Sequence, residues 1–206
     1  MKQEIITYLA GPKGNTDAEE REKAVRDVMN AYQIPFDDSR ILYGNFSSNV
    51  QKQVNELLDR FPHMEAMICA NDVMAETAYR ECNKRGLIVG KDIAITGFDD
   101  WELAETMNPP LTTVLQNAFD MGYMAIIGAV ELCKGKKCHS VVVSASVRIR
   151  ESCGCSVDRN SYEETSILGK ETHWTAIVES YLDSMLKEVL PANSNKELKG
   201  RIRDYL

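Results

Sequence analysis

Short apolar runs alternate with longer segments of helical spacing along the first hundred residues of the chain. Residues 66–70 (Ala-Met-Ile-Cys-Ala) are apolar at every position, which is typical of a strand buried on both faces of a parallel sheet. Between the runs, apolar side chains recur every three or four residues, a spacing that predicts amphipathic helices. Four strand–helix pairs with short connections predict a doubly wound parallel α/β sheet. The predicted strands are residues 5–10, 40–43, 66–70 and 92–98, with a fifth over residues 111–116.

Polar residues at the predicted helix starts support these boundaries. Thr16-x-x-Glu19 and Ser48-x-x-Gln51 both fit the capping box, in which two side chains satisfy free N–H groups of a helix start. Asn71 and Asp99 each follow a predicted strand directly, and each is placed to cap the helix that comes next. We therefore expect helices to begin at these four points.

The second half of the chain is organised differently. A predicted helix over residues 118–133 leads through a basic turn to a β-like stretch at residues 140–150. Further on, apolar positions recur at helical spacing over Trp174–Leu190. We interpret residues 1–155 as an α/β lobe and residues 156–206 as a linker with a C-terminal α-helical extension.

Composition narrows the possible functions. The chain has 206 residues, 44% hydrophobic and 27% charged, and 31 acidic against 24 basic side chains give a net charge of −7. An acidic chain neutralises phosphates poorly, so these residues are not expected to bind nucleic acid or an anionic membrane by themselves. No apolar run reaches the roughly 20 residues of a membrane span, and the first ten residues do not fit a signal peptide. We expect a cytoplasmic protein.

The six cysteines do not indicate a disulfide framework, because such frameworks belong to short secreted domains. Cys69 and Cys82 fall at predicted core positions of a strand and a helix. Cys153-Gly154-Cys155 could supply half of a metal site, but the spacing of Cys133 and Cys138 provides no second half. We expect neither a metal nor another cofactor.

Polar and aromatic residues gather where the predicted strands end. Ligands of open parallel sheets bind outside the carboxyl ends of the strands. The segments there are Gly11–Asn15, Gly44–Phe46, Asn71-Asp72 and Asp99-Asp100, and none holds a nucleophile beside a base. Gly11-x-x-Gly14 does not match a phosphate-binding loop, and the three histidines lie far apart. The pattern favours a site that binds a molecule over one that transforms it, so we do not expect an enzyme.

Four residues in or near these segments allow both a structural and a ligand-binding interpretation. Arg21 interrupts the apolar stripe of its predicted helix, where it either pairs with a surface acid or reaches toward ligand oxygens at the strand ends. Asn71 and Asp99 serve either as helix caps or as hydrogen-bonding groups for a ligand. Phe46 is either a core aromatic or a flat surface on which a sugar ring stacks. Residue patterning alone leaves these alternatives open.

Several ordered motifs resemble the LacI/GalR family of bacterial transcriptional regulators. The resemblance is to the effector-binding region of that family, which has a periplasmic-binding-protein-like fold, and it extends from about residue 5 to residue 153. The motifs are Ala70-Asn71-Asp72-Val73-Met74-Ala75, the segment Gly86–Asp100, Pro109-Pro110-Leu111-Thr112-Thr113-Val114, Met121-Gly122 and Arg150-Glu151-Ser152-Cys153.

In that family two α/β lobes close on a small molecule, often a sugar or a purine. The resemblance implies that Arg21 contacts the effector and that Phe46 is an aromatic of the cleft. It implies that Asn71 and Asp99 hydrogen-bond ligand hydroxyls. It also places Gln116 on a strand that crosses between the lobes and faces the cleft.

The chain departs from the family pattern in three respects. It has Ala118 where some members place an aromatic, and about fifty residues follow the motif at which family repressors usually end. It also lacks the helix-turn-helix and most of the N-terminal lobe, to which only residues 118–144 correspond, so we interpret it as a truncated sensor. We expect such a half-cleft to bind sugars no more tightly than millimolar, because it excludes little water.

These features predict a sugar- or nucleoside-sensing module of a LacI/GalR-type regulator that works by ligand-driven lobe closure. Its expected partners are the small-molecule effector, a second copy of the chain in a homodimer, and DNA only through a domain outside these residues. The C-terminal extension allows one alternative, the sensor region of a signalling protein fused to a diguanylate cyclase or a histidine kinase. A purely structural oligomerisation fragment is a third interpretation.

Overall fold

The computed structural model describes residues 5–155. These residues divide into two compact units, one formed by residues 5–116 with 145–155 and the other by residues 117–144. The chain therefore leaves the first unit after Gln116 and returns to it at Ala145. The helices predicted beyond residue 155 lie outside the described residues.

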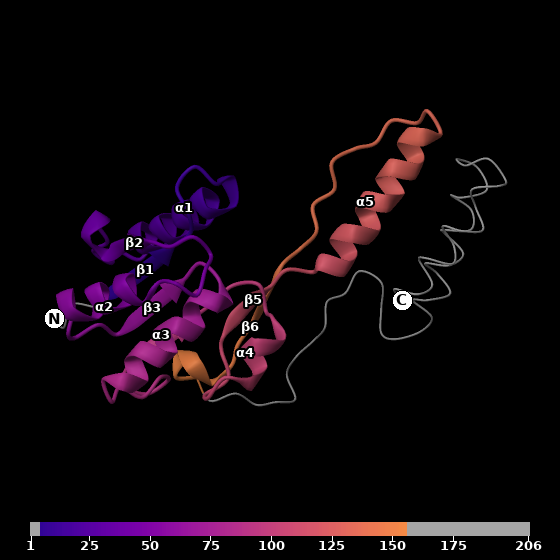
Figure 1. Cartoon of the computed structure of the whole chain (residues 1–206). Helices are drawn as coiled ribbons and strands as arrows, with labels where there is room; N and C mark the ends of the chain where they lie inside the picture. The colour runs from indigo at the N-terminus through magenta and orange to yellow at the C-terminus, as the bar shows by residue number, and fades with distance from the viewer. Residues whose placement is uncertain (1–4, 156–206) are drawn as a thin grey trace. The chain divides into compact units, whose positions relative to one another are not determined.

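A four-stranded parallel sheet forms the centre of the first unit (Figure 1). In the pairing register, Tyr8 lies opposite Ile41 on one side and Ile68 on the other. The chain passes from the first strand to one side and then returns to the other, so a switch in winding direction occurs beside the first strand, where ligands of such sheets bind. The strands are β1 (Ile6–Ala10), β2 (Ile41–Tyr43), β3 (Ala66–Cys69) and β4 (Ala94–Thr96), in the spatial order β2-β1-β3-β4.

Helices cover the sheet on both sides, which confirms the predicted doubly wound α/β fold. In Figure 1 the sheet lies between α1 (Thr16–Ala31) on one side and the pair α2 (Gln51–Arg60) and α3 (Asp72–Lys84) on the other. Leu57 of α2 and Met74 of α3 are fully buried in one core with the strand residues. Cys69 and Cys82 belong to this core, as predicted.

The first two helices do not begin where the capping boxes predicted. Asn15, not Thr16, caps α1: its side chain accepts a hydrogen bond from the backbone N–H of Ala18 at 3.0 Å, while Thr16 is already helical. Helix α2 begins after Val50 without a side-chain cap, so the Ser48 prediction is wrong. The carbonyl of Ser48 instead accepts a hydrogen bond from the hydroxyl of Thr77, which ties this loop to α3.

The other two predicted starts have opposite outcomes. Asn71 caps α3 and accepts a hydrogen bond from the backbone N–H of Met74 at 2.9 Å. Asp99 caps no helix, because α4 (Glu102–Thr106) begins only after Trp101. The backbone at Asp99 has a φ of 111° instead, which is far from the extended conformation of a helix cap.

The strands after β4 are shorter than predicted and form a second sheet. Strand β5 (Thr113–Leu115) pairs with β6 (Ser146–Arg148) in antiparallel register. Isolated parallel bridges join Thr96, the last residue of β4, to Thr112 just before β5, and Asp99 to Leu115 of β5. Because these strands precede Gln116 and follow Ala145, they carry the chain out of the first unit and back into it.

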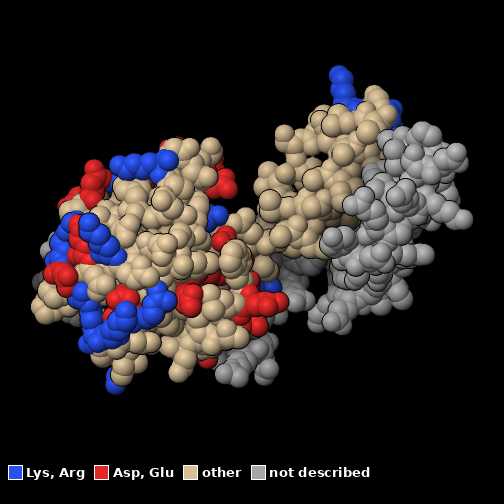
Figure 2. All heavy atoms as spheres, in the orientation of Figure 1, with Lys and Arg blue, Asp and Glu red and all other residues tan. Residues whose placement is uncertain are grey.

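The second unit is built around α5 (Ala118–Cys133), which confirms the helix predicted there. Figure 2 shows Lys and Arg interspersed with Asp and Glu on the first unit, whereas few charges appear on the visible face of the second. Among residues 5–155 no helix meets the length and apolarity needed to cross a membrane. Large apolar side chains of α5 are exposed, namely Phe119, Met121, Ile126 and Leu132.

Candidate functional site

The edge of the sheet at the carboxyl ends of the strands gathers the five residues expected to contact a ligand. Arg21 is on α1, Phe46 on the loop after β2 and Asn71 at the start of α3, while Asp99 and Gln116 follow β4 and β5. We call these five residues the rim site. Contacts join all of them into one cluster, although they span 95 positions of sequence.

The guanidinium of Arg21 lies at the centre of the rim site. Its Nη1 donates a hydrogen bond to the carbonyl of Ala70 at 2.6 Å, and its Nη2 lies 3.6 Å from Oδ1 of Asp99. Its Cζ is 3.8 Å from the ring centroid of Phe98 and 5.5 Å from that of Phe46. With a side chain only 17% exposed, Arg21 turns inward to the rim instead of pairing with a surface acid.

Asp99 is held by the residues around it. Its Oδ1 accepts a hydrogen bond from Nε2 of Gln116 at 3.0 Å, and its backbone N–H donates to the carbonyl of Val114 at 2.9 Å. Partial burial raises the pKa of Asp99 above its ordinary value, and the neighbouring Arg21 and Gln116 oppose that rise. A partly desolvated carboxylate of this kind is a strong hydrogen-bond acceptor for hydroxyl groups.

Asn71 combines a structural role with a place in the site. While its Oδ1 caps α3, its Nδ2 donates to the carbonyl of Phe46 at 3.2 Å. Phe46 packs partly against the core and has a φ of 52°, a conformation that side chains with a Cβ rarely adopt. A Cβ added at Gly11 would lie 2.5 Å from Cζ of Phe46, so the absence of a side chain at Gly11 makes room for the ring.

Two parts of the site were not predicted from the sequence. The first is the aromatic face of Phe98, whose position at the end of an apolar run gave no sign that it would stack on Arg21. The second is the buried carboxylate of Asp72, which accepts hydrogen bonds from the Thr113 hydroxyl at 2.6 Å and from the Trp101 N–H at 2.9 Å. Burial raises the pKa of Asp72, and these two bonds oppose the rise. Asp72 thereby joins α3, β5 and the turn that carries Asp99.

An apolar cavity of about 340 Å³ lies beside the rim site, along the sheet. Arg21 and Phe98 line it together with apolar side chains of the sheet and of α1, among them Ile68 and Val25. Tyr8 also lines this cavity, and burial raises the pKa of its hydroxyl.

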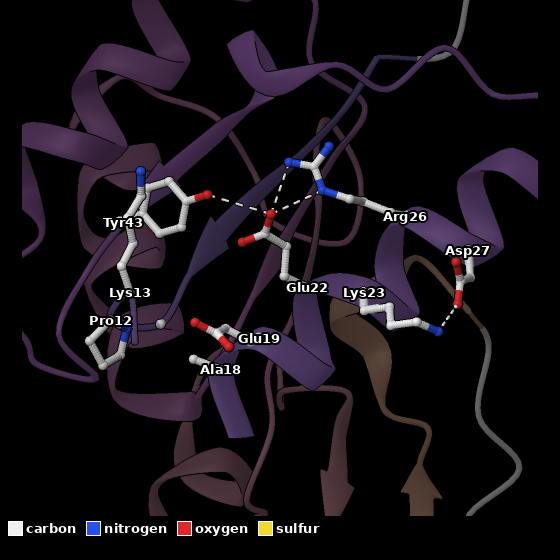
Figure 3. Close-up of a pocket in the computed structure, with 10 residues that line it drawn as sticks. Pro12, Lys13, Ala18, Glu19, Glu22, Lys23, Arg26, Asp27 and Tyr43 are labelled. Atoms are coloured by element: carbon white, nitrogen blue, oxygen red, sulfur yellow. Dashed lines mark hydrogen bonds and ion pairs between the residues drawn. The ribbon is translucent and has the colours of Figure 1, made fainter. Parts of the chain in front are cut away.

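A second cavity, of about 400 Å³, lies on another side of α1, and we call it the outer pocket. Figure 3 shows that several of its charged side chains pair with one another. Glu22 pairs with Arg26 at 2.8 Å and accepts a hydrogen bond from the Tyr43 hydroxyl at 3.4 Å. Lys23 pairs with Asp27, also at 2.8 Å.

The rim site has the groups needed to bind a polar molecule. It presents a guanidinium, a carboxylate, two amides and aromatic rings, which suit hydrogen bonds to hydroxyls and stacking on an apolar ring face. No group of three or more His, Cys, Asp or Glu side chains within residues 5–155 is arranged to hold a metal. The five residues of the rim site, all within residues 5–155, include no nucleophile paired with a base.

Comparisons with known proteins show the family to which the chain belongs. Residues 3–153 match the profile of the periplasmic binding protein-like domain. Over 150 residues the chain is 31% identical to the HTH-type transcriptional regulator CelR of Thermobifida fusca, covering 71% of this chain and 44% of that protein. It is 34% identical over 122 residues to the ribose operon repressor of Escherichia coli (strain K12), covering 59% of this chain and 37% of the repressor.

Solved structures show the same fold. A CelR–cellobiose complex superposes with a TM-score of 0.68 at 30% identity, covering 73% of this chain and 47% of that one. A Lac repressor bound to ONPG superposes with a TM-score of 0.67 at 28% identity, covering 73% of this chain and 46% of the repressor. The chain spans less than half the length of these relatives, which are transcriptional regulators and not enzymes. The chain belongs to the periplasmic binding protein-like domain family, in the form found in LacI-family transcriptional regulators.

Proposed function

We propose that the first unit is the ligand-contacting lobe of a sugar-responsive transcriptional regulator, and that the rim site contacts the sugar. The observation that carries the proposal is the convergence of Arg21 and Gln116 on one carboxylate oxygen: Oδ1 of Asp99 lies 3.6 Å from Nη2 of Arg21 and accepts a hydrogen bond from Nε2 of Gln116 at 3.0 Å. A relative solved with cellobiose and another named for ribose support a sugar as the ligand.

Each residue of the rim site has a part in this proposal. The Asp99 carboxylate accepts hydrogen bonds from sugar hydroxyls, and the Arg21 guanidinium donates to sugar oxygens. The amide of Gln116 adds a donor and an acceptor beside them. Phe46 offers an aromatic ring to the apolar face of the sugar. Asn71 acts chiefly by holding the Phe46 loop, since both ends of its amide are already hydrogen-bonded.

In this proposal the first unit is one of two lobes that close on the sugar. A sugar that binds more tightly to the closed arrangement of two lobes shifts the protein toward closure, and only that difference in affinity drives the change. The relatives are more than twice as long as the matched part of this chain. We propose that residues outside this sequence complete the second lobe and bind DNA, and that the regulator works as a homodimer, as in the Lac repressor dimer bound to operator.

NMR titration of the ¹⁵N-labelled chain with cellobiose and with D-ribose tests the proposal. We expect at least one sugar to shift the amide resonances of Phe46, Asp99 and Gln116 with a dissociation constant in the millimolar range, because a single lobe leaves the sugar hydrated on one side. Asp99→Asn should weaken this binding about tenfold or more, as expected for loss of a charged hydrogen-bond partner.

Asp59→Asn is the matched control. Asp59 pairs with Arg85 at 2.6 Å on an exposed surface, and the substitution removes the same charge without touching the rim site. If the sugars shift only residues of the outer pocket, or if Asp59→Asn weakens binding as much as Asp99→Asn does, the rim site is not the sugar site.

A further inference from the structure

The turn that carries Asp99 has an unusual backbone. Asp99 and the next residue, Asp100, both have positive φ values, of 111° and 55°. Residues with a Cβ rarely adopt such conformations, and two in succession persist only where surrounding contacts hold them. The turn therefore needs an anchor beyond the rim site itself.

Asp100 supplies that anchor by forming ion pairs with Arg148 and Arg150, which come from the last part of the first unit's sequence. Its Oδ1 lies 2.7 Å from Nη1 of Arg150, and its Oδ2 lies 3.7 Å from Nε of Arg148. The Asp100 and Arg150 side chains are each only 10% exposed, so their ion pair is shielded from solvent. Asp99 and Asp100 thus face different partners, Asp99 toward the rim site and Asp100 toward the arginines.

Arg150 is itself fixed in place. Its Nη1 donates to the carbonyl of Leu111 at 2.9 Å, and its Nη2 lies 3.2 Å from Oε1 of Glu105. Its backbone N–H donates to Oγ1 of Thr112, and its carbonyl accepts from the same hydroxyl, both at 2.8 Å. These bonds attach Arg150 to the segment that leads into β5, so Asp100 is held against a rigid element.

We propose that Asp100 and Arg150 are positioning residues for ligand binding: their ion pair holds the positive-φ turn that aims the Asp99 carboxylate at Arg21 and Gln116. Without the Asp100 charge, the turn keeps the Asp99 N–H bond to Val114 and the Trp101 N–H bond to Asp72 but loses its link to Arg150, and a rotation at Asp100 then displaces its neighbour Asp99. Arg148 is the last residue of β6, and Arg150 follows two residues later. The ion pairs therefore link the ligand contact to the strand of the first unit with which the chain resumes after residues 117–144.

The ligand contact in this inference rests on the proposed function, but its first test needs no ligand. In the full chain, Asp100→Asn should shift the side-chain N–H resonances of Arg21 and Gln116, because the Asp99 carboxylate they contact moves. Asp59→Asn, the exposed-pair control, should leave both resonances in place. Unchanged Arg21 and Gln116 resonances in a folded Asp100→Asn variant would overturn the inference, whether or not any sugar binds.

A double-mutant cycle with the sugar that binds, cellobiose or D-ribose, provides the second test. Asp100→Asn alone should weaken binding about tenfold, whereas in the Asp99→Asn background it should add less than about twofold, because it acts through Asp99. An equal effect in both backgrounds would show that Asp100 acts on stability or contacts the sugar itself. If Asp100→Asn does not fold, Arg150→Gln removes the same ion pair from the arginine side and should shift the same two resonances; no shift in a folded Arg150→Gln variant contradicts the proposal. If neither sugar binds the unsubstituted chain, the proposed function fails for these sugars while the ligand-free test still decides this inference.

Discussion

Charged side chains on two sides of helix α1 find their partners in different parts of the chain. On the outer pocket, Glu22 and Arg26 are one turn apart on the same helix and pair with each other, and Arg26 also pairs with the exposed Asp38. On the rim side, Arg21 reaches the carbonyl of Ala70 and the carboxylate of Asp99, which come from distant parts of the sequence. A pair between neighbours on one helix carries little specificity, because it forms wherever the helix forms, whereas a pair between distant parts of the sequence depends on the fold and defines a site.

The largest expected difference between the two sides is in the effect of removing an arginine. Arg21→Gln leaves the Ala70 carbonyl and the Asp99 carboxylate with fewer partners in a half-buried place, so we expect the free energy of unfolding to fall by about 1–3 kcal/mol. Arg26→Gln removes the exposed pair with Asp38 and the partly exposed pair with Glu22 on the same helix, and should cost no more than about 1 kcal/mol. Urea unfolding of both variants measures this difference, and equal losses would contradict the contrast.

A methyl group added beside the rim site should have the next largest effect on stability. Gly11→Ala places a methyl group within 2.7 Å of both the Phe46 ring and Cβ of Ala18, and we expect a loss of about 1–3 kcal/mol from this overpacking. Gly122→Ala makes the same change in α5, where the added Cβ meets nothing within 4 Å, and should stabilise the helix by up to about 1 kcal/mol. Thermal unfolding compares the two, and a Gly11→Ala variant as stable as the unsubstituted chain would show that Phe46 is free to move away.

A smaller effect is expected in the pH dependence of stability. The buried Asp72 beside the rim site and the exposed Asp37 should change the stability with pH in opposite directions. The pKa of Asp72 is raised by burial, so its charge opposes folding once the pH exceeds the ordinary aspartate value. Relative to Asp72→Asn, the unsubstituted chain should lose stability as the pH rises from about 4 through the raised pKa, by about 1.4 kcal/mol per unit of the shift. Hydrogen bonds from Ser39 lower the pKa of the exposed Asp37.

Relative to Asp37→Asn, the chain should therefore gain stability as the pH rises toward about 4, and lose it as the pH falls through the lowered pKa. Chemical unfolding at a series of pH values measures both differences. Slopes of the same sign for Asp72 and Asp37 would mean that Asp72 is not desolvated in the way the structure indicates.

The sequence was sufficient for the parts of the fold that depend on local patterns. The fully apolar run at residues 66–70 and the helical spacing after Asn71 predicted β3 and α3, because burial and capping there follow from neighbouring residues. The start of α1 was predicted one residue late, since Asn15 and Thr16 are both good caps and only the backbone geometry decides between them.

The parts that depend on distant contacts were predicted incompletely. Asp99 was expected to be a possible helix cap, but hydrogen bonds to β5 and the anchor at Arg150 hold its turn in a positive-φ conformation. The position of Arg21 within an apolar stripe showed that it was unusual, yet its partner, the Ala70 carbonyl, lies 49 residues away. The predicted order of strands and helices placed Phe46, Asn71 and Asp99 at the strand ends and left two interpretations of Arg21 open, whereas Gln116 was added only by the family resemblance.

A crystal structure of the chain grown with a high concentration of the sugar that binds, cellobiose or D-ribose, tests the central claim most directly. The account predicts electron density for the sugar in contact with Arg21, Asp99 and Gln116, with Phe46 beside it. Sugar density in the outer pocket, between Glu22 and Tyr43, with none at the rim would contradict it.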